Sequence, residues 1–131
     1  MFIKELLNEM YTAYALSADS RKKLAERYPP KYSKFVGHHV TEQFGVPRGT
    51  EAPEQANIEV VGYIDSQDGL EALVVSVNGS DKRPDGGTYH ITWSLEPDKY
   101  APKDSNMMIK VAGYDPVPMP ISIHTEPQVL G

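Results

Sequence analysis

The sequence contains no cysteine and no long run of apolar residues. The first absence excludes disulfides, metal sites built from thiolates, and catalysis by a cysteine nucleophile. The second excludes a membrane-spanning helix, which needs about 20 predominantly apolar residues. Glu5 and Glu9 interrupt the amino-terminal stretch where a signal peptide would be apolar. We therefore expect a cytoplasmic protein with no membrane partner.

Positive charge is also scarce, since 13 Lys and Arg face 18 Asp and Glu and the formal net charge is −5 at pH 7. A protein that binds extended duplex nucleic acid through its overall field would be basic, so we do not expect that partner. The length of 131 residues is that of one ordinary domain, and 40% hydrophobic residues suffice for a core. We predict one domain over residues 1–131. Nothing in the sequence sets the oligomeric state.

Apolar spacing predicts a short amphipathic helix over residues 2–10, at the start of the chain. A strand over 11–16 follows, and then a helix over 18–28 with Ser17 as its N-cap. The later segments read as strands separated by turns and loops, over 35–44, 57–64, 70–77, 88–95 and 119–124. This order predicts an α+β fold with antiparallel sheet, and not a doubly wound nucleotide-binding fold.

Two of the four histidines open the same kind of tripeptide, His39-Val40-Thr41 and His90-Ile91-Thr92. Each tripeptide lies in a predicted strand, where alternation sends His and Thr to one face and the apolar residue to the other. One such triplet is a weak signal, because short motifs recur by chance and a structural histidine is the ordinary explanation. Two such triplets in two predicted strands favour a functional role for both histidines.

The same alternation assigns the neighbours of these tripeptides. Ser94 is expected to continue the polar face of the second strand, while Trp93 points into the core. His38 is expected to point away from His39 and to be structural. His124 has no matching threonine two residues later, and we expect a structural role for it as well.

A pair of imidazoles suits the cleavage of a phosphodiester by acid and base. One neutral ring removes a proton from water or a ribose hydroxyl, and the other, protonated, delivers a proton to the leaving oxygen. Because the unperturbed pKa of histidine is about 6.5, both forms coexist near neutral pH. The threonine hydroxyls can hold the non-bridging phosphate oxygens. This chemistry needs no metal and no other cofactor.

The motifs resemble those of the 2H phosphoesterase superfamily, the LigT-like enzymes whose signature is two His-hydrophobic-Thr/Ser motifs. The two blocks read FVGHHVTEQFGV and YHITWSL, and APKDSNMMI is similar to the segment that follows the second motif in one branch. That branch contains the cyclic phosphodiesterase domain of fungal tRNA ligases. The likeness spans roughly residues 11–112, and the 51 residues from His39 to His90 suggest a compact version.

The resemblance implies a compact bilobal α+β fold in which the two motif strands face each other across a central cleft. It implies four catalytic residues, His39, Thr41, His90 and Thr92. It also implies hydrolysis of a nucleotide or oligonucleotide, such as a 2′,3′-cyclic phosphate at an RNA end or a 2′–5′ linkage. Some small viral members, the anti-CBASS nucleases, destroy the cyclic oligonucleotide messengers of anti-phage defence, and the short chain makes that group a candidate.

Five further residues are candidates for substrate binding. Lys31 and Lys34 belong to a basic segment that is either a solvated surface or a rim that attracts phosphate. Arg83 lies in the loop before the second motif, and Ser94 follows that motif. Tyr11 either stacks on a nucleobase or packs in the core.

The sequence thus leads to one main hypothesis and two alternatives. The main one is a metal-independent phosphodiesterase with two catalytic histidines. A protein that sequesters a nucleotide without cutting it is the first alternative, although it would need no acid–base pair. A 2′,3′-cyclic phosphodiesterase of RNA-end repair is the second, and only the substrate separates it from the main hypothesis.

Overall fold

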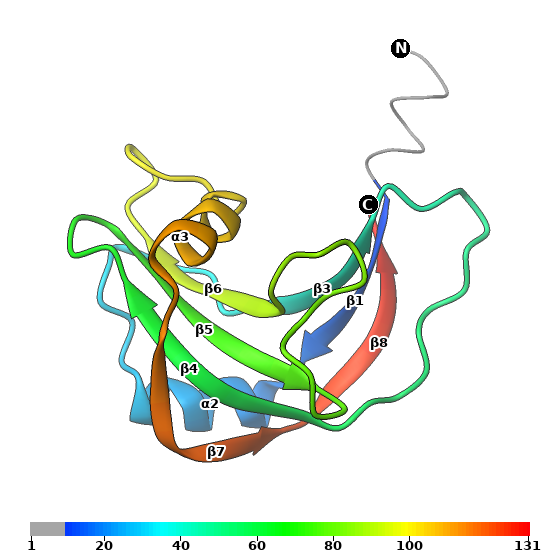
Figure 1. Ribbon diagram of the computed structural model, residues 1–131, viewed down its shortest axis with the longest axis horizontal. Coiled ribbons are helices and arrows are strands. Elements are labelled where there is room, and N and C mark those ends of the chain that lie inside the picture. Colours follow the sequence, from blue (N-terminus) through cyan, green and yellow to red (C-terminus); the bar gives the residue numbers. More distant parts are fainter. Residues whose placement is uncertain (1–9) are drawn as a thin grey trace.

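The computed structural model describes residues 10–131, and Figure 1 shows their fold. The helix predicted over residues 2–10 lies outside this range except for Met10. The described residues form two helices, α2 (Ala18–Arg27) and α3 (Asp104–Ala112). They also form eight strands, which are β1 (Tyr11–Leu16), β2 (Lys34–Phe35), β3 (His39–Phe44), β4 (Ile58–Asp65), β5 (Leu70–Val77), β6 (His90–Leu95), β7 (Asp115–Ile123) and β8 (Thr125–Leu130).

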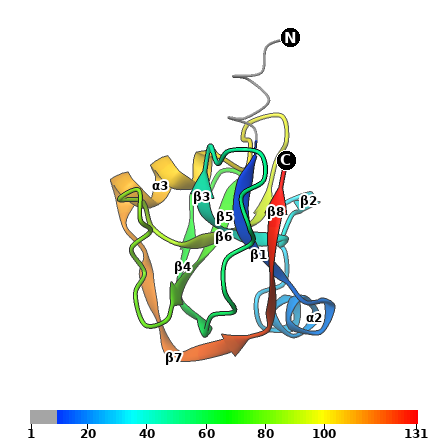
Figure 2. The same ribbon diagram turned by 90° about the vertical axis from the view of Figure 1, so that its right-hand side faces the viewer.

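The strands build two antiparallel sheets, which confirms the predicted α+β class. One sheet has the order β3-β1-β8 and the other the order β2-β6-β5-β4-β7. The chain passes between the sheets at His124, where β7 ends in the larger sheet and β8 begins in the smaller (Figure 2). The expected tail strand over 119–124 is therefore part of a longer strand, and a second strand comes after it.

The main core fills the space between the two sheets and α2. Leu24 of α2 packs with Tyr14 and Val40 of the small sheet and with Ile91 and Trp93 of the large one. Trp93 is fully buried and its indole N–H donates to the carbonyl of Tyr28, as its strand phase predicts for a core residue. Ser17 caps α2 by accepting from the backbone N–H of Ser20, which confirms the predicted N-cap.

A second, smaller apolar cluster lies on the opposite face of the large sheet, beneath α3. It joins Ile109 of the helix to Ala72 and Val74 of β5 and to Ile64 of β4. The two clusters show that α2 and α3 cover opposite faces of this sheet (Figure 1). Side chains of β6 at alternate positions therefore face either the main core or α3.

The strand predicted over residues 35–44 is in fact two strands in different sheets. Gly37 separates them with φ of +47°, and a Cβ there would lie 2.5 Å from the Phe35 ring, so only glycine fits. The Gly37 N–H donates to the carbonyl of Thr92 in β6, and the Arg21 side chain donates to the carbonyls of Val36 and Gly37. This crossing brings the start of β3 against β6.

Candidate active site

Both His-x-Thr tripeptides line one cavity, although they belong to different sheets. The cavity has a volume of about 310 Å³ and lies where β3 meets β6, on the side covered by α3. His39 and Thr41 line it from β3, and His90 and Thr92 line it from β6. Val40 and Ile91, the residues between them, are fully buried in the main core. The alternation predicted for both tripeptides is confirmed.

His39 contacts an aromatic ring and a second imidazole. Its ring centroid lies 5.3 Å from that of Tyr11, and its Nδ1 lies 2.9 Å from Nδ1 of His38. One of these two nitrogens must donate to the other. Burial lowers the pKa of His39 to about 4, with repulsion from His38 and His90 acting in the same direction. His39 is therefore a neutral imidazole at pH 7.

His38 lines the same cavity, so the expectation that it points away from His39 is wrong. The strand alternation does not apply to it, because β3 begins at His39 and the left-handed backbone of Gly37 comes just before. His38 is exposed, and its ring lies edge-to-face against the half-buried ring of His39, with the centroids 5.1 Å apart. The cavity thus contains three imidazoles.

His90 is the more deeply buried imidazole of the two motifs. Its Nδ1 lies 2.8 Å from the carbonyl oxygen of Thr88. A carbonyl only accepts, so Nδ1 carries a proton and Nε2 is the nitrogen that gains or loses one. Burial lowers the pKa of His90, and the nearby positive charge of Arg83 lowers it as well.

The two threonine hydroxyls have different surroundings. The Thr92 hydroxyl lies 3.0 Å from the carbonyl of Pro102 and 2.8 Å from the hydroxyl of Ser105, both in the segment at the start of α3. Thr41 is buried on the cavity wall. The segment APKDSNMMI therefore contacts the second motif through hydrogen bonds to Thr92. Its Lys103 and Asn106 also line the cavity. The sequence pointed to this segment only as a likeness, without roles for its residues.

Two aromatic residues, Tyr11 and Phe44, belong to the cavity wall. Tyr11 lines the cavity as predicted, and its ring lies 5.7 Å from that of Phe44, which is 50% exposed. Phe44 was not expected from the sequence, because the end of a strand gives no sign of which side chain stays exposed. Tyr14, by contrast, is buried in the main core.

Arg83 lies beside this cavity and not in its wall. It lines a second cavity of about 420 Å³, and Asn106 lines both. The Arg83 side chain is only 6% exposed although it comes from a loop. Its Nη2 donates to Oδ1 of Asn106 at 3.2 Å. Arg83 therefore contacts a residue that lines both cavities.

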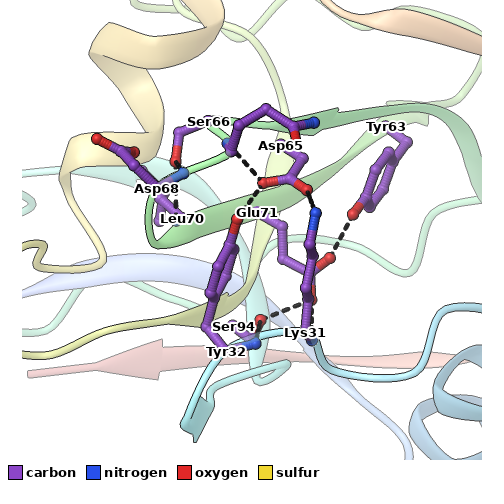
Figure 3. Close-up of polar contacts among 10 residues, drawn as sticks. Lys31, Tyr32, Tyr63, Asp65, Ser66, Asp68, Leu70, Glu71 and Ser94 are labelled. Atoms are coloured by element: carbon purple, nitrogen blue, oxygen red, sulfur yellow. Dashed lines mark hydrogen bonds and ion pairs between the residues drawn. The ribbon is translucent and has the colours of Figure 1, made fainter.

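Lys31 and Lys34 do not line either of these cavities. Lys31 forms an ion pair with Asp65, at the turn between β4 and β5 (Figure 3). Lys34 is exposed on β2, which pairs with the far end of β6. The structure therefore places both lysines outside the cavity that contains His39 and His90, a position that fits a solvated surface better than a rim of that cavity.

Ser94, like Arg83 and the two lysines, does not line the first cavity. Ala72 pairs with Thr92 but Glu71 pairs with Ser94, so β6 contains one extra residue at Trp93. This bulge turns Ser94 away from the face of His90 and Thr92. Its hydroxyl is fully buried and donates to the Glu71 carboxylate, as Figure 3 shows.

No acidic side chain is among the described residues that line the first cavity, whereas the cation Lys103 is. Such a wall favours an anionic ligand. Within residues 10–131, no three His, Asp or Glu side chains come together in a metal-ligating group. Neither helix of that range has the length and apolar run that a bilayer crossing requires.

The low pKa of His39 predicts how stability depends on pH. The unfolded histidine has a pKa near 6.5 and the folded one about 4, so the unfolded chain binds more protons between these values. The free energy of unfolding should therefore fall as the pH drops from 6.5 to 4, by up to about 3 kcal/mol from this residue.

Urea denaturation at pH 7 and pH 4.5 measures this effect. His39→Asn, which cannot titrate, should lose less stability over the same interval than the unsubstituted protein. Equal losses in both proteins would show that the buried imidazole does not titrate as described.

Comparison of the chain with models of known protein families, with curated proteins and with solved structures finds no match.

Proposed function

We propose that this protein hydrolyses a phosphodiester bond of a cyclic nucleotide, or of a cyclic or 2′–5′-linked oligonucleotide, by acid–base catalysis between His39 and His90. One observation carries the proposal. Two strands of different sheets present an imidazole and a hydroxyl each to a single cavity whose described wall has no carboxylate.

His39 is the general base in this proposal, because its low pKa keeps the imidazole neutral and able to accept a proton at pH 7. It takes a proton from the attacking water as the water oxygen bonds to phosphorus. His90 gives a proton from Nε2 to the oxygen whose bond to phosphorus breaks, and its Nδ1–H stays on the Thr88 carbonyl. The phosphate anion offsets the burial that lowers the pKa of His90, because an adjacent negative charge favours imidazolium.

Thr41 and Thr92 stabilise the charge that develops on the non-bridging oxygens. The Thr92 hydroxyl turns from the Pro102 carbonyl to the phosphate, which is a rotation about one bond, and Ser105 remains within reach of it. Tyr11 and Phe44 offer aromatic rings in the cavity wall, where a nucleobase can stack.

The resemblance of the two motifs to the 2H phosphoesterase superfamily supports the same proposal. That family places its motif strands on either side of a cleft, and the two sheets here, with β3 and β6 at their junction, are compatible with such a bilobal fold. The likeness of residues 102–106 to the segment after the second motif is compatible too, since three of these residues line the cavity.

Hydrolysis should survive removal of divalent ions, because two imidazoles supply both proton transfers. Dialysis against EDTA followed by a turnover assay in metal-free buffer tests this expectation. The rate should stay within about twofold of the untreated protein. Complete loss of turnover, restored by one added divalent ion, would show that a metal does the work assigned to the histidines.

A substrate panel tests the proposed function itself. It contains cyclic mono-, di- and trinucleotides, 2′–5′ oligoadenylate, and RNA ending in a 2′,3′-cyclic phosphate. Turnover of at least one member, lost in His39→Ala and kept in His124→Ala, supports the proposal; His124 is exposed and lies outside the cavity. Cleavage of cyclic di- or trinucleotides would favour a role against anti-phage messengers, and cleavage of RNA ends a role in repair. Tight binding without turnover would overturn the proposal and favour sequestration.

A further inference from the structure

The guanidinium of Arg83 is buried with one of its nitrogens unpaired. Nε donates to Oδ1 of Asp85 at 2.9 Å, and Nη2 donates to Asn106. Nη1 is buried and has no hydrogen-bond partner anywhere in the part of the chain that the structure describes. Leaving a buried donor unsatisfied costs about 1–3 kcal/mol, and more for a charged group. The guanidinium carbon also lies 5.3 Å from the centroid of the Phe44 ring, a contact that supplies no hydrogen-bond acceptor for Nη1.

The fold holds this guanidinium in place instead of letting it reach water. The loop closes on itself through Arg83 N–H to the Gly87 carbonyl and Gly86 N–H to the Arg83 carbonyl. A Cβ at Gly87 would lie 2.6 Å from Nη2, so this glycine is what allows the guanidinium to come so close to the backbone. The loop therefore holds the Arg83 side chain in one place through its own hydrogen bonds and through the space that Gly87 leaves.

The position of Arg83 is next to the proposed catalytic cavity. Gly87 and Thr88 follow it along the second cavity, and the Thr88 carbonyl holds Nδ1 of His90. Asn106 stands between the cavities, with its Oδ1 on Arg83. A ligand that passes from one cavity to the other crosses this residue.

The charges of the second cavity favour an anion beside Arg83. Arg83 and Lys110 line it, and Asp85 is the one acidic residue among its described lining. The Asp85 side chain is 42% exposed and contacts Nε, at the other end of the guanidinium from Nη1. Nη1 carries two N–H groups, and phosphate oxygens match the fork of an arginine better than any neutral acceptor does.

We propose that Arg83 binds a second phosphate of the substrate, one nucleotide away from the phosphate that is cleaved. The inference rests on the proposed function and narrows it. The preferred substrate is an oligonucleotide or a nucleotide with an additional phosphate, and a cyclic mononucleotide with a single phosphate is a poor one. The cleaved phosphate lies between His39 and His90, and the second reaches Nη1 of Arg83 across Asn106.

Two nucleotides that differ in one phosphate test this preference. They are adenosine 2′,3′-cyclic phosphate and the same molecule with an added 5′-phosphate. In an oligonucleotide, the phosphate that links the preceding nucleotide occupies this 5′ position. We expect kcat/KM to be roughly tenfold or more higher for the second, the worth of one charge-assisted hydrogen bond. Arg83→Gln should bring the ratio of the two values close to one. Lys82→Gln, an exposed cation one residue away, should keep the ratio.

A binding measurement on the unsubstituted protein separates this inference from the proposed function. The side-chain Nε–H resonance of Arg83, identified by its absence in Arg83→Gln, is followed while pyrophosphate is added. It should shift and saturate, and Lys82→Gln should show the same titration. Arg83→Lys, with thermal denaturation as the check on folding, should retain part of the substrate preference because it keeps the charge.

The outcomes are distinct. A shifting Arg83 resonance without hydrolysis of any phosphodiester would support the anion site and overturn the proposed function. Hydrolysis with the same kcat/KM for both nucleotides, or an Arg83 resonance that ignores saturating pyrophosphate, would overturn the second-phosphate site and leave the proposed function standing.

Discussion

His39→Ala and His90→Ala should each lower kcat by about 10²–10⁴, the usual contribution of a positioned acid or base. The two imidazoles line one cavity and serve the same transition state. The double variant should therefore fall little below the worse single variant, since groups that act as a unit are strongly non-additive. Single-turnover rates with the best substrate of the panel measure all three.

A loss of kcat in these variants shows a catalytic role only if the variants still fold. His39 and His90 face the cavity, and the core contacts of their strands come from Val40 and Ile91. Circular dichroism and thermal denaturation should thus remain close to those of the unsubstituted protein. His124→Ala is the matched control, while His38→Ala should change the pH profile because His38 contacts His39. If His124→Ala abolished turnover and His39→Ala spared it, the site would be wrongly placed.

Glu71→Ala should destabilise the fold by about 3–5 kcal/mol, because it leaves three donors without an acceptor and each buried unsatisfied donor costs about 1–3 kcal/mol. Glu71 is 1% exposed in the middle of the large sheet. Its carboxylate accepts from the hydroxyls of Tyr63 and Ser94 and from the backbone N–H of Lys31 at 2.8 Å (Figure 3). Truncation leaves all three donors without their acceptor.

Urea denaturation at pH 7 measures the loss, and Glu71→Gln is the control of equal shape. The amide keeps an oxygen for one or two of the donors, so Glu71→Gln should lose clearly less stability than Glu71→Ala. A change of less than about 1 kcal/mol in Glu71→Ala would mean that water replaces the carboxylate, and that the network does not hold β5, β6 and the segment before β2 together.

The sequence was sufficient to place the four motif residues, because strand alternation is a local property. His39 and Thr41 share one face and Val40 the other whatever sheet the strand joins, and the same holds for the second motif. The α+β class also followed from local patterns. The N-cap at Ser17 needed only the hydroxyl and the residues after it.

The failures arise where a strand departs from regular geometry. Ser94 lies beyond a bulge at Trp93, and a single extra residue reverses the face of the residues after it. His38 lies beyond the break at Gly37, so its neighbour in sequence is also its neighbour in the cavity. No local pattern marks the bulge at Trp93, whereas a glycine inside a predicted strand, as at Gly37, is itself a sign of a break. Lys31 was misplaced for another reason, since its ion pair with Asp65 joins segments far apart in the chain.

The pairing of β1 with β8 has a consequence for the order in which the protein forms. Tyr11 pairs with Leu130 and Leu16 with Thr125, so the middle strand of the small sheet finds one neighbour only when the ribosome has reached residue 130. Pairings this distant in sequence are slow to form, because loop closure must precede them. His39 belongs to that late sheet and His90 to the other. The sheet that carries His39 is therefore complete only after residues 125–130 have been made, whereas the β5–β6 pairing that carries His90 needs no residue beyond Leu95.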